Sequence, residues 1–178
     1  MNTRHFKFAG FIPPSKSQWI RALLLKSYNP AIHIQLNNNE TSDLICDDVL
    51  HTLNAVEVIT KRTHEPDSTT NSLRVGSSAA AFRFLILRAS RIPGTSIISG
   101  DSQLFLRPHN PLLGILAHFN VSVTTSPNSW TLNSSGWNAK SNILKVDSTF
   151  SSQFLSAVLL KTYSKWIPHF RVNFSVRC

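Results

Sequence analysis

The sequence contains few cysteines and few glycines. Its two cysteines, Cys46 and Cys178, are too few for a scaffold of several disulfides or for a four-cysteine zinc site. None of the six glycines belongs to a GxxxxGK[ST] or GxGxxG phosphate loop, and no GxSxG nucleophile motif occurs. The seven histidines are scattered, without the spacing of metal ligands. The sequence therefore shows none of these common catalytic signatures.

Long apolar runs and acidic residues are also scarce. The longest apolar stretch, residues 79–87, is interrupted by Arg83 and is far shorter than the ~20 residues that cross a bilayer. Charged residues interrupt residues 4–12, whereas a signal peptide has a continuous apolar segment. We therefore expect a cytoplasmic protein with no membrane partner. The sequence has 18 Lys and Arg against 9 Asp and Glu, which gives a formal net charge of +9. This excess favours anionic partners such as phosphorylated metabolites or nucleic acid.

Apolar residues are plentiful, and their patterns alternate between strands and helices. With 42% hydrophobic and 15% charged residues, 178 residues can form one domain, or one and a fraction. We predict strands over residues 5–9, 31–36, 57–62, 72–75, 96–99, 121–124, 130–132, 143–146 and 168–176. We predict helices over residues 16–26, 47–56, 77–90, 111–119 and 151–163.

Two internal similarities indicate a repeated unit. Residues 53–58 and 116–121 share a pattern that we interpret as a helix end running into a strand. Three predicted helices begin with small hydroxyl residues, at Ser15, Ser77 and Ser151. Their spacing suggests a supersecondary unit of roughly 60–75 residues that is used more than once. We therefore expect an α/β (α+β) domain with the helices packed together and the sheets outside.

The helix starts could bind an anion. Backbone N–H groups at a helix N-terminus are unpaired and carry positive partial charge, and Lys16 with Arg21 would add full charges there. If three such starts converge, they form a pocket for a small polyanion. The alternative is that each serine is only a helix cap. Arg107 could likewise be a solvated charge, and Arg83 could pair with a buried carboxylate or a backbone carbonyl.

Five segments are similar to one set of family motifs, in order along the chain. They are residues 14–25 (motif P-x-K-S-x-x-x-R-A-L-L-L), 42–49 (motif S-x-D-D-V, with Asp47-Asp48-Val49 matching), 76–83 (motif G-N-A-G-T-x-x-R), 100–108 (motif G-D/E…R-P) and 151–157 (motif S-S-Q-F-L-S-A). These segments resemble the signatures of the 5-enolpyruvylshikimate-3-phosphate synthases. The resemblance covers essentially the whole chain.

The resemblance implies a reaction and a set of ligands. The family, 3-phosphoshikimate 1-carboxyvinyltransferase, transfers the enolpyruvyl group of phosphoenolpyruvate to shikimate 3-phosphate, releases phosphate and uses no metal or organic cofactor. The matching positions imply that shikimate 3-phosphate contacts Lys16, Ser17, Arg21, Ser151, Ser152 and Gln153. They imply that phosphoenolpyruvate contacts Lys16, Ala79, Arg107 and Gln153. The catalytic carboxylate is expected in a second lobe, outside this sequence.

The sequence departs from the family in two ways. Ser77, Ala79 and Ala80 replace the family's Asn, Gly and Thr, and a methyl at Ala79 predicts weaker binding of phosphoenolpyruvate and of glyphosate, which occupies that site. Family members are also considerably longer and have two lobes of repeated βαβαββ units. We therefore expect residues 1–13 to be a strand of the missing lobe and residues 14–178 to be an incomplete shikimate 3-phosphate lobe.

Three functions remain open at this point. The first is a transferase fragment that is inactive alone and that a C-terminal chain could complement. The second is a non-catalytic module that binds a phosphorylated metabolite. The third is a basic nucleic-acid binder, although the basic residues are not interleaved with aromatic residues as in common RNA-binding modules.

Overall fold

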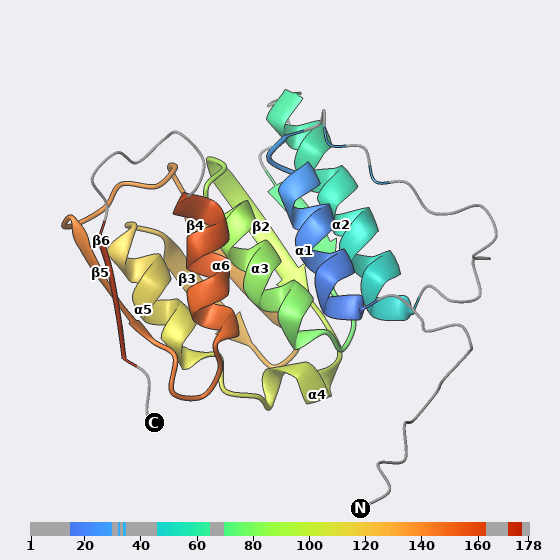
Figure 1. Cartoon of the computed structure of the whole chain (residues 1–178). Coiled ribbons are helices and arrows are strands. Elements are labelled where there is room, and N and C mark those ends of the chain that lie inside the picture. Colours follow the sequence, from blue (N-terminus) through green and yellow to red (C-terminus); the bar gives the residue numbers. More distant parts are fainter. Residues whose placement is uncertain are drawn as a thin grey trace, which may run out of the picture.

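The computed structural model describes residues 15–29, 32, 34, 46–64, 70–162 and 171–175. The helices in this part of the chain are α1 (Lys16–Lys26), α2 (Asp47–His64), α3 (Ala79–Ala89), α4 (Ser102–Phe105), α5 (Asn110–His118) and α6 (Gln153–Thr162). The strands are β1 (Thr70–Arg74), β2 (Gly94–Ser99), β3 (Ser122–Ser126), β4 (Ser129–Ser134), β5 (Ile143–Asp147) and β6 (Arg171–Ser175). Figure 1 shows their arrangement.

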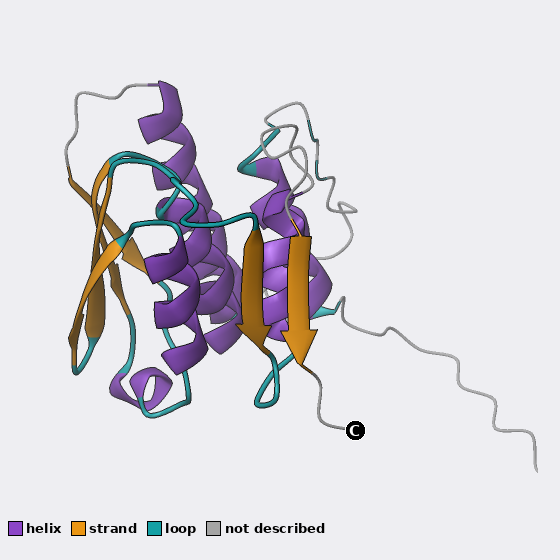
Figure 2. Cartoon of the chain, turned by 90° about the vertical axis from the view of Figure 1, so that its left-hand side faces the viewer, coloured by secondary structure: helices purple, strands orange, loops and turns teal. Residues whose placement is uncertain are grey.

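The strands form two sheets that lie outside a layer of helices. The four-stranded sheet has the order β1-β2-β4-β3, in which β1 and β2 are parallel and β4 is antiparallel to both of its neighbours. The two-stranded sheet pairs β5 with β6 in parallel. Figure 2 shows the four-stranded sheet against one side of the helices and the two-stranded sheet against another. The expected α/β class, with helices inside and sheets outside, is confirmed.

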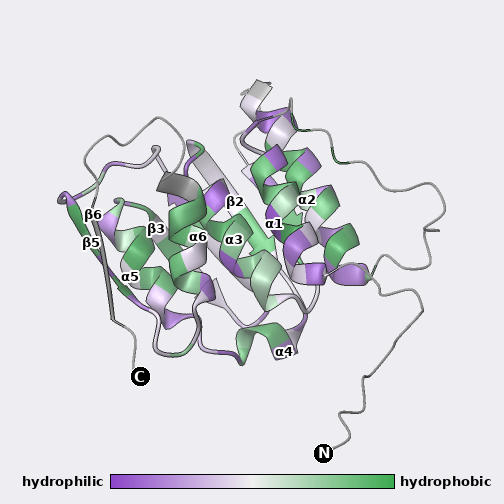
Figure 3. Ribbon diagram, viewed as in Figure 1, coloured by the Kyte–Doolittle hydropathy of each residue, from purple (hydrophilic) through white to green (hydrophobic). Residues whose placement is uncertain are grey.

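Helix α3 is the centre of the core. All of its residues except Ala80 are buried, and it packs against α1, α2 and α6 as well as against β2. Figure 3 shows α3, α5 and α6 as mainly hydrophobic, whereas α1 and α2 alternate between hydrophobic and hydrophilic residues. A helix that is apolar around its whole circumference is expected to be enclosed by other elements. Two arginines, Arg83 and Arg88, are nevertheless buried in α3.

One βαβαββ run is present in the described chain. Elements β1, α3, β2, α5, β3 and β4 follow one another in this order, with the short helix α4 inserted after β2. Elements β5, α6 and β6 then form a further β-α-β segment with parallel strands. The described residues hold no second complete run, so the predicted repetition of this unit stays a prediction.

The predicted strand at residues 57–62 is wrong, because this segment continues α2. Val58, Ile59 and Thr60 are β-branched and favour strands when judged locally. The buried positions of α2, however, recur with helical spacing at Val49, Thr52, Ala55, Val56, Ile59 and Arg62. Packing of this face against α1, β1 and α3 therefore outweighs local propensity. The interpretation of residues 53–58 as a helix running into a strand is wrong for the same reason.

The other predicted elements differ from the observed ones mainly at their ends. Helix α4 was not predicted, since four residues are too few to show a period. The predicted strand 5–9 and the proposed unit 1–13 lie outside the described residues, as does most of the strand predicted over 31–36. No helix in the described chain is both long enough and apolar enough to cross a membrane.

Candidate anion-binding site

The N-terminal ends of α1, α3 and α6 lie at the same end of the helix layer. Figure 1 shows these three ends together at the lower edge of the helices, close to α4. Helix α3 packs against both α1 and α6. The unpaired N–H groups of three helix starts therefore face one region, which is the geometry expected of an anion-binding pocket.

Lys16, the first residue of α1, forms an ion pair at this end. Its Nζ donates to Oδ2 of Asp48, in the first turn of α2, at 2.6 Å. The hydrogen bond and charge of Asp48 raise the pKa of Lys16 above its ordinary value. The Lys16 side chain is 54% exposed, so a ligand can still reach it. Asp48 thus holds the ammonium group charged and in a defined place.

Ser17 and Arg21 interact one turn apart on α1. Nη1 of Arg21 donates to the hydroxyl oxygen of Ser17 and, at 3.3 Å, to the Ser17 carbonyl oxygen. These two side chains therefore share one surface of α1. Ser15 occupies the N-cap position, but its side chain makes no capping hydrogen bond. The serines at the start of α1 therefore do not act as ordinary side-chain caps.

The turn into α3 depends on Gly76 and Ser78. Gly76 has a φ of +57°, and a Cβ there would lie 2.6 Å from Cδ2 of His51 in α2. The Ser78 hydroxyl accepts a hydrogen bond from the N–H of Ala81 at 3.3 Å, so Ser78 is a helix cap. Ala79 is the first residue of α3 and is 8% exposed.

Arg83 connects α3 to the start of α6. Its Nη1 donates to Oγ of Ser151 at 3.0 Å and to Oε1 of Gln153 at 2.8 Å. Its Nη2 donates to the carbonyl oxygen of Pro108 at 3.3 Å, which confirms the predicted backbone partner. The guanidinium also lies over the ring of Phe154, 4.5 Å from the ring centroid. A buried arginine thus joins three segments at the candidate site.

Arg107 completes a cluster of positive charge. Burial lowers the pKa of Arg83, and the nearby charge of Arg107 lowers it further. The same Arg107 charge opposes the rise in the pKa of Lys16. Within the described residues no carboxylate forms an ion pair with Arg83 or Arg107. The cluster therefore carries positive charge that an anionic ligand can neutralise.

The structure brings only some of the predicted substrate-contacting residues together. Ser151 and Gln153 meet at Arg83. Arg107 lies within electrostatic reach of Arg83, and Lys16 lies within electrostatic reach of Arg107. Ser152 is exposed in the turn before α6. Sequence reasoning missed the contacts of Arg83 with the start of α6. A charged residue within a continuous apolar helix was the available signal, because such a residue must find polar partners when it is buried.

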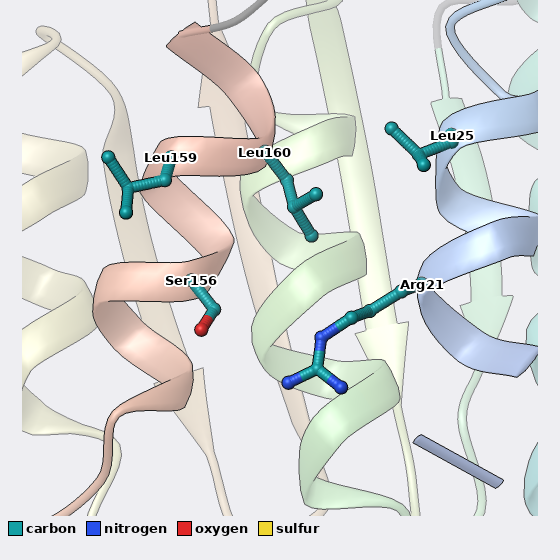
Figure 4. A pocket seen from close by; sticks show the side chains of 5 residues that line it. All are labelled: Arg21, Leu25, Ser156, Leu159 and Leu160. Atoms are coloured by element: carbon teal, nitrogen blue, oxygen red, sulfur yellow. The ribbon is translucent and has the colours of Figure 1, made fainter. Parts of the chain in front are cut away.

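A groove of about 450 Å³ lies beside the cluster, between α1 and α6. Its lining residues are Arg21, Leu25, Ser156, Leu159 and Leu160. Figure 4 shows Arg21 extending from α1 toward α6, with the leucines farther along the groove. Arg21 thus faces both the start of α1 and the helix that carries Ser151 and Gln153. In the described chain, no group of three or more His, Cys, Asp or Glu side chains could hold a metal ion.

Comparisons with known proteins identify the family. The family model for EPSP synthase (3-phosphoshikimate 1-carboxyvinyltransferase) matches residues 12–164. A 3-phosphoshikimate 1-carboxyvinyltransferase of Methanococcoides burtonii is 35% identical over 97 residues, 54% of this chain and 23% of that protein. Enzymes of the same name from Rhizobium leguminosarum bv. trifolii and Psychromonas ingrahamii are 27% and 30% identical, over 83% and 84% of this chain.

The matched region is a minor part of each of these relatives. The chain spans 37% of the length of the Rhizobium protein and 38% of the Psychromonas protein. The family model, in contrast, covers most of this chain, from residue 12 to residue 164. The protein therefore belongs to the EPSP synthase family.

Proposed function

We propose that the protein takes part in enolpyruvyl transfer from phosphoenolpyruvate to shikimate 3-phosphate. In this reaction the 5-hydroxyl oxygen of shikimate 3-phosphate bonds to the enolpyruvyl carbon, and phosphate leaves. Both substrates are anions. The observation that supports the proposal most directly is the cluster of Lys16, Arg83 and Arg107, without enough described carboxylates to balance it, at the convergent helix starts.

Shikimate 3-phosphate is proposed to lie between α1 and the start of α6. Lys16, Ser17 and Arg21 would contact it from α1. Ser151 and Ser152 would contact its phosphate from the other side, and Gln153 would contact it from a place between the two substrates. The support is that Arg21 extends across the groove toward α6 (Figure 4). Hydroxyl and amide donors combined with a guanidinium fork suit the oxygens of a phosphate group.

Phosphoenolpyruvate is proposed to lie nearer to Arg107, in contact with Lys16, Ala79, Arg107 and Gln153. The support is the electrostatic proximity of Arg107 to both Lys16 and Arg83. Fixed positive groups at this place would stabilise negative charge that develops in the transition state. Lys16 would contact both substrates.

Turnover is proposed to require a complementing polypeptide that carries the rest of the family fold. In this proposal, residues 14–178 form part of the shikimate 3-phosphate lobe, and the complementing chain provides the catalytic carboxylate. The support is that the chain spans less than two fifths of the relatives compared above. Asp48, the carboxylate described next to Lys16, is already held in an ion pair.

A non-catalytic binding module is the second candidate, and Ala79 is the observation that favours it. The family has glycine at this position, and the methyl of Ala79 would oppose a close approach of phosphoenolpyruvate. Binding of shikimate 3-phosphate would be unaffected. The Ala79→Gly variant should then bind phosphoenolpyruvate and glyphosate more tightly in calorimetric titrations. Equal affinities would remove this argument.

A phosphate-release assay separates the two candidates. The protein is mixed with both substrates, either alone or with the C-terminal portion of a full-length relative. We expect phosphate release only in the mixture, and none when Lys16→Met replaces the wild-type chain. Binding of shikimate 3-phosphate without turnover in the mixture would support the binding module. Failure of the wild-type chain to bind shikimate 3-phosphate would contradict both.

A further inference from the structure

Arg83 is the most unusual group at the candidate site. It is 6% exposed, it lies in a helix whose other residues except Arg88 are apolar, and no carboxylate in the described chain pairs with it. Its Nε is buried without a hydrogen-bond partner. Burying a guanidinium whose donors are not all satisfied is unfavourable, and Arg83 differs in this from Arg88, whose Nε donates to Ser27, so packing alone is a poor explanation here. The partners that it does have suggest a different role.

The contacts of Arg83 fix the hydrogen-bonding direction of Ser151. A hydroxyl group has two acceptor lone pairs and one hydrogen to donate. Oγ of Ser151 accepts one hydrogen bond from Arg83 Nη1 at 3.0 Å and another from the N–H of Gln153 at 3.2 Å. Both of its lone pairs are therefore occupied. The hydroxyl can interact with a ligand only by donating its hydrogen.

Gln153 is restricted in the same way. Its carboxamide has one accepting oxygen and an NH₂ group that donates two hydrogen bonds. Oε1 accepts from Arg83 Nη1 at 2.8 Å, which turns the oxygen toward α3. The Nε2 hydrogens make no hydrogen bond to a described residue. The amide is thus held with its donors available and its acceptor occupied.

We propose that Arg83 is a positioning residue that makes Ser151 and Gln153 pure donors, so that the start of α6 accepts the phosphate of a ligand and discriminates against ligands that lack it. Arg83 acts through these two side chains and its own long-range charge. This inference rests on the proposed function, because it takes shikimate 3-phosphate as the ligand of this region. It assigns to Arg83 a role that goes beyond packing of the core.

The test measures dissociation constants for shikimate 3-phosphate and for shikimate by titration calorimetry. The variants are Arg83→Met, Gln153→Leu and the double variant, and circular dichroism checks that each is folded. We expect each single variant to bind shikimate 3-phosphate about tenfold more weakly, which corresponds to ~1.4 kcal/mol. Because the two side chains act as one unit, the double variant should be little weaker than either single variant.

Two controls separate positioning from stability. Arg88→Met removes the other buried arginine of α3, which donates to Ser27 and lies over the ring of Tyr28, so it should lower stability but leave the dissociation constant unchanged. Arg83→Lys keeps the charge but lacks the planar second nitrogen that holds the Pro108 carbonyl while Nη1 holds Ser151 and Gln153. It should weaken binding even if Arg83→Met fails to fold.

The second readout is the ratio of the dissociation constants for shikimate and for shikimate 3-phosphate. Loss of positioning should reduce the preference for shikimate 3-phosphate over shikimate, whereas a merely structural loss would weaken both ligands equally. The inference is overturned if a folded Arg83→Lys or Arg83→Met binds as tightly as wild type, if the losses in the double variant multiply, or if the preference is unchanged. A wild-type chain that does not bind shikimate 3-phosphate would instead contradict the proposed function.

Discussion

Lys16 combines a proposed ligand role with an existing ion pair. Its Nζ lies 2.6 Å from Oδ2 of Asp48, which is in α2. An anion that binds Lys16 must therefore share the ammonium with a carboxylate. Asp48 keeps the ammonium in place, but its negative charge also repels the ligand. At the residue scale, the balance of these two effects decides the affinity.

We predict that repulsion dominates and that Asp48→Asn binds shikimate 3-phosphate more tightly. The Asn side chain can still accept a hydrogen bond from Lys16, while the negative charge is gone. A partly exposed pair contributes ~0.2–1 kcal/mol, so the gain should be about 1.4-fold to fivefold at low ionic strength. Titration calorimetry measures it. Asp101→Asn, which removes a separate exposed ion pair with Arg74, is the matched control and should change nothing. Weaker binding by Asp48→Asn would show that positioning dominates.

His109 provides a residue-scale prediction for pH. The ring is buried between Phe82 and Trp130, and burial lowers its pKa to about 4. The unfolded chain takes up a proton near pH 6.5, whereas the folded chain does so only near pH 4. The unfolded state therefore binds more protons in this window, so stability falls as the pH decreases from 6.5 toward 4.

Replacing His109 by Phe should remove this part of the pH dependence. We expect the free energy of unfolding of wild type to decrease between pH 6.5 and 5 more steeply than that of His109→Phe. Carboxylates titrate mainly below this range and are common to both proteins. Urea unfolding at several pH values gives both slopes. Equal slopes would mean that His109 is not held neutral in the folded protein.

At the element scale, the turn between β1 and α3 places the candidate site. It directs α3 so that Arg83 reaches the start of α6, and it needs Gly76 because of the positive φ and the nearby ring of His51. An added Cβ would force the His51 ring away from α2 and would be strained at this φ. The positive φ at Gly76 therefore helps to set the position of Arg83 at the site.

We predict that Gly76→Ala lowers the free energy of unfolding by about 1–2 kcal/mol or more. Gly114→Ala is the matched control, because Gly114 lies within α5 and an added Cβ there meets no atom within 4 Å. That substitution should stabilise the protein by ~0.5–1 kcal/mol. Urea unfolding compares the two variants. A Gly76→Ala protein as stable as wild type would contradict the account of this turn.

The elements also show where sequence reasoning succeeds. Helix α1 was predicted with its observed bounds, residues 16–26, since an apolar period and a preceding serine marked its start. Residues 57–62 were assigned to a strand because β-branched side chains dominate them. Their helical state depends on the face that α2 presents to α1 and α3, and that face is decided by packing between distant segments.

At the scale of the whole molecule, the class and the family could be predicted from motifs, but the contacts within the site could not. The order of Lys16, Arg107 and Gln153 along the chain says nothing of which side chain meets which. Arg83 was expected to pair with a buried carboxylate or a backbone carbonyl, and its contacts with Ser151 and Gln153, 68 and 70 residues away, were not foreseen. Such long-range pairings arise only from the fold.

The most direct test of the account is a crystal structure of the protein with shikimate 3-phosphate. The account predicts the phosphate at the start of α6, in hydrogen-bond reach of the donors of Ser151 and Gln153, and the ring beside Lys16 and Arg21. A ligand bound on another surface, or no bound ligand at saturating concentration, would contradict the claim that the convergent helix starts form its site.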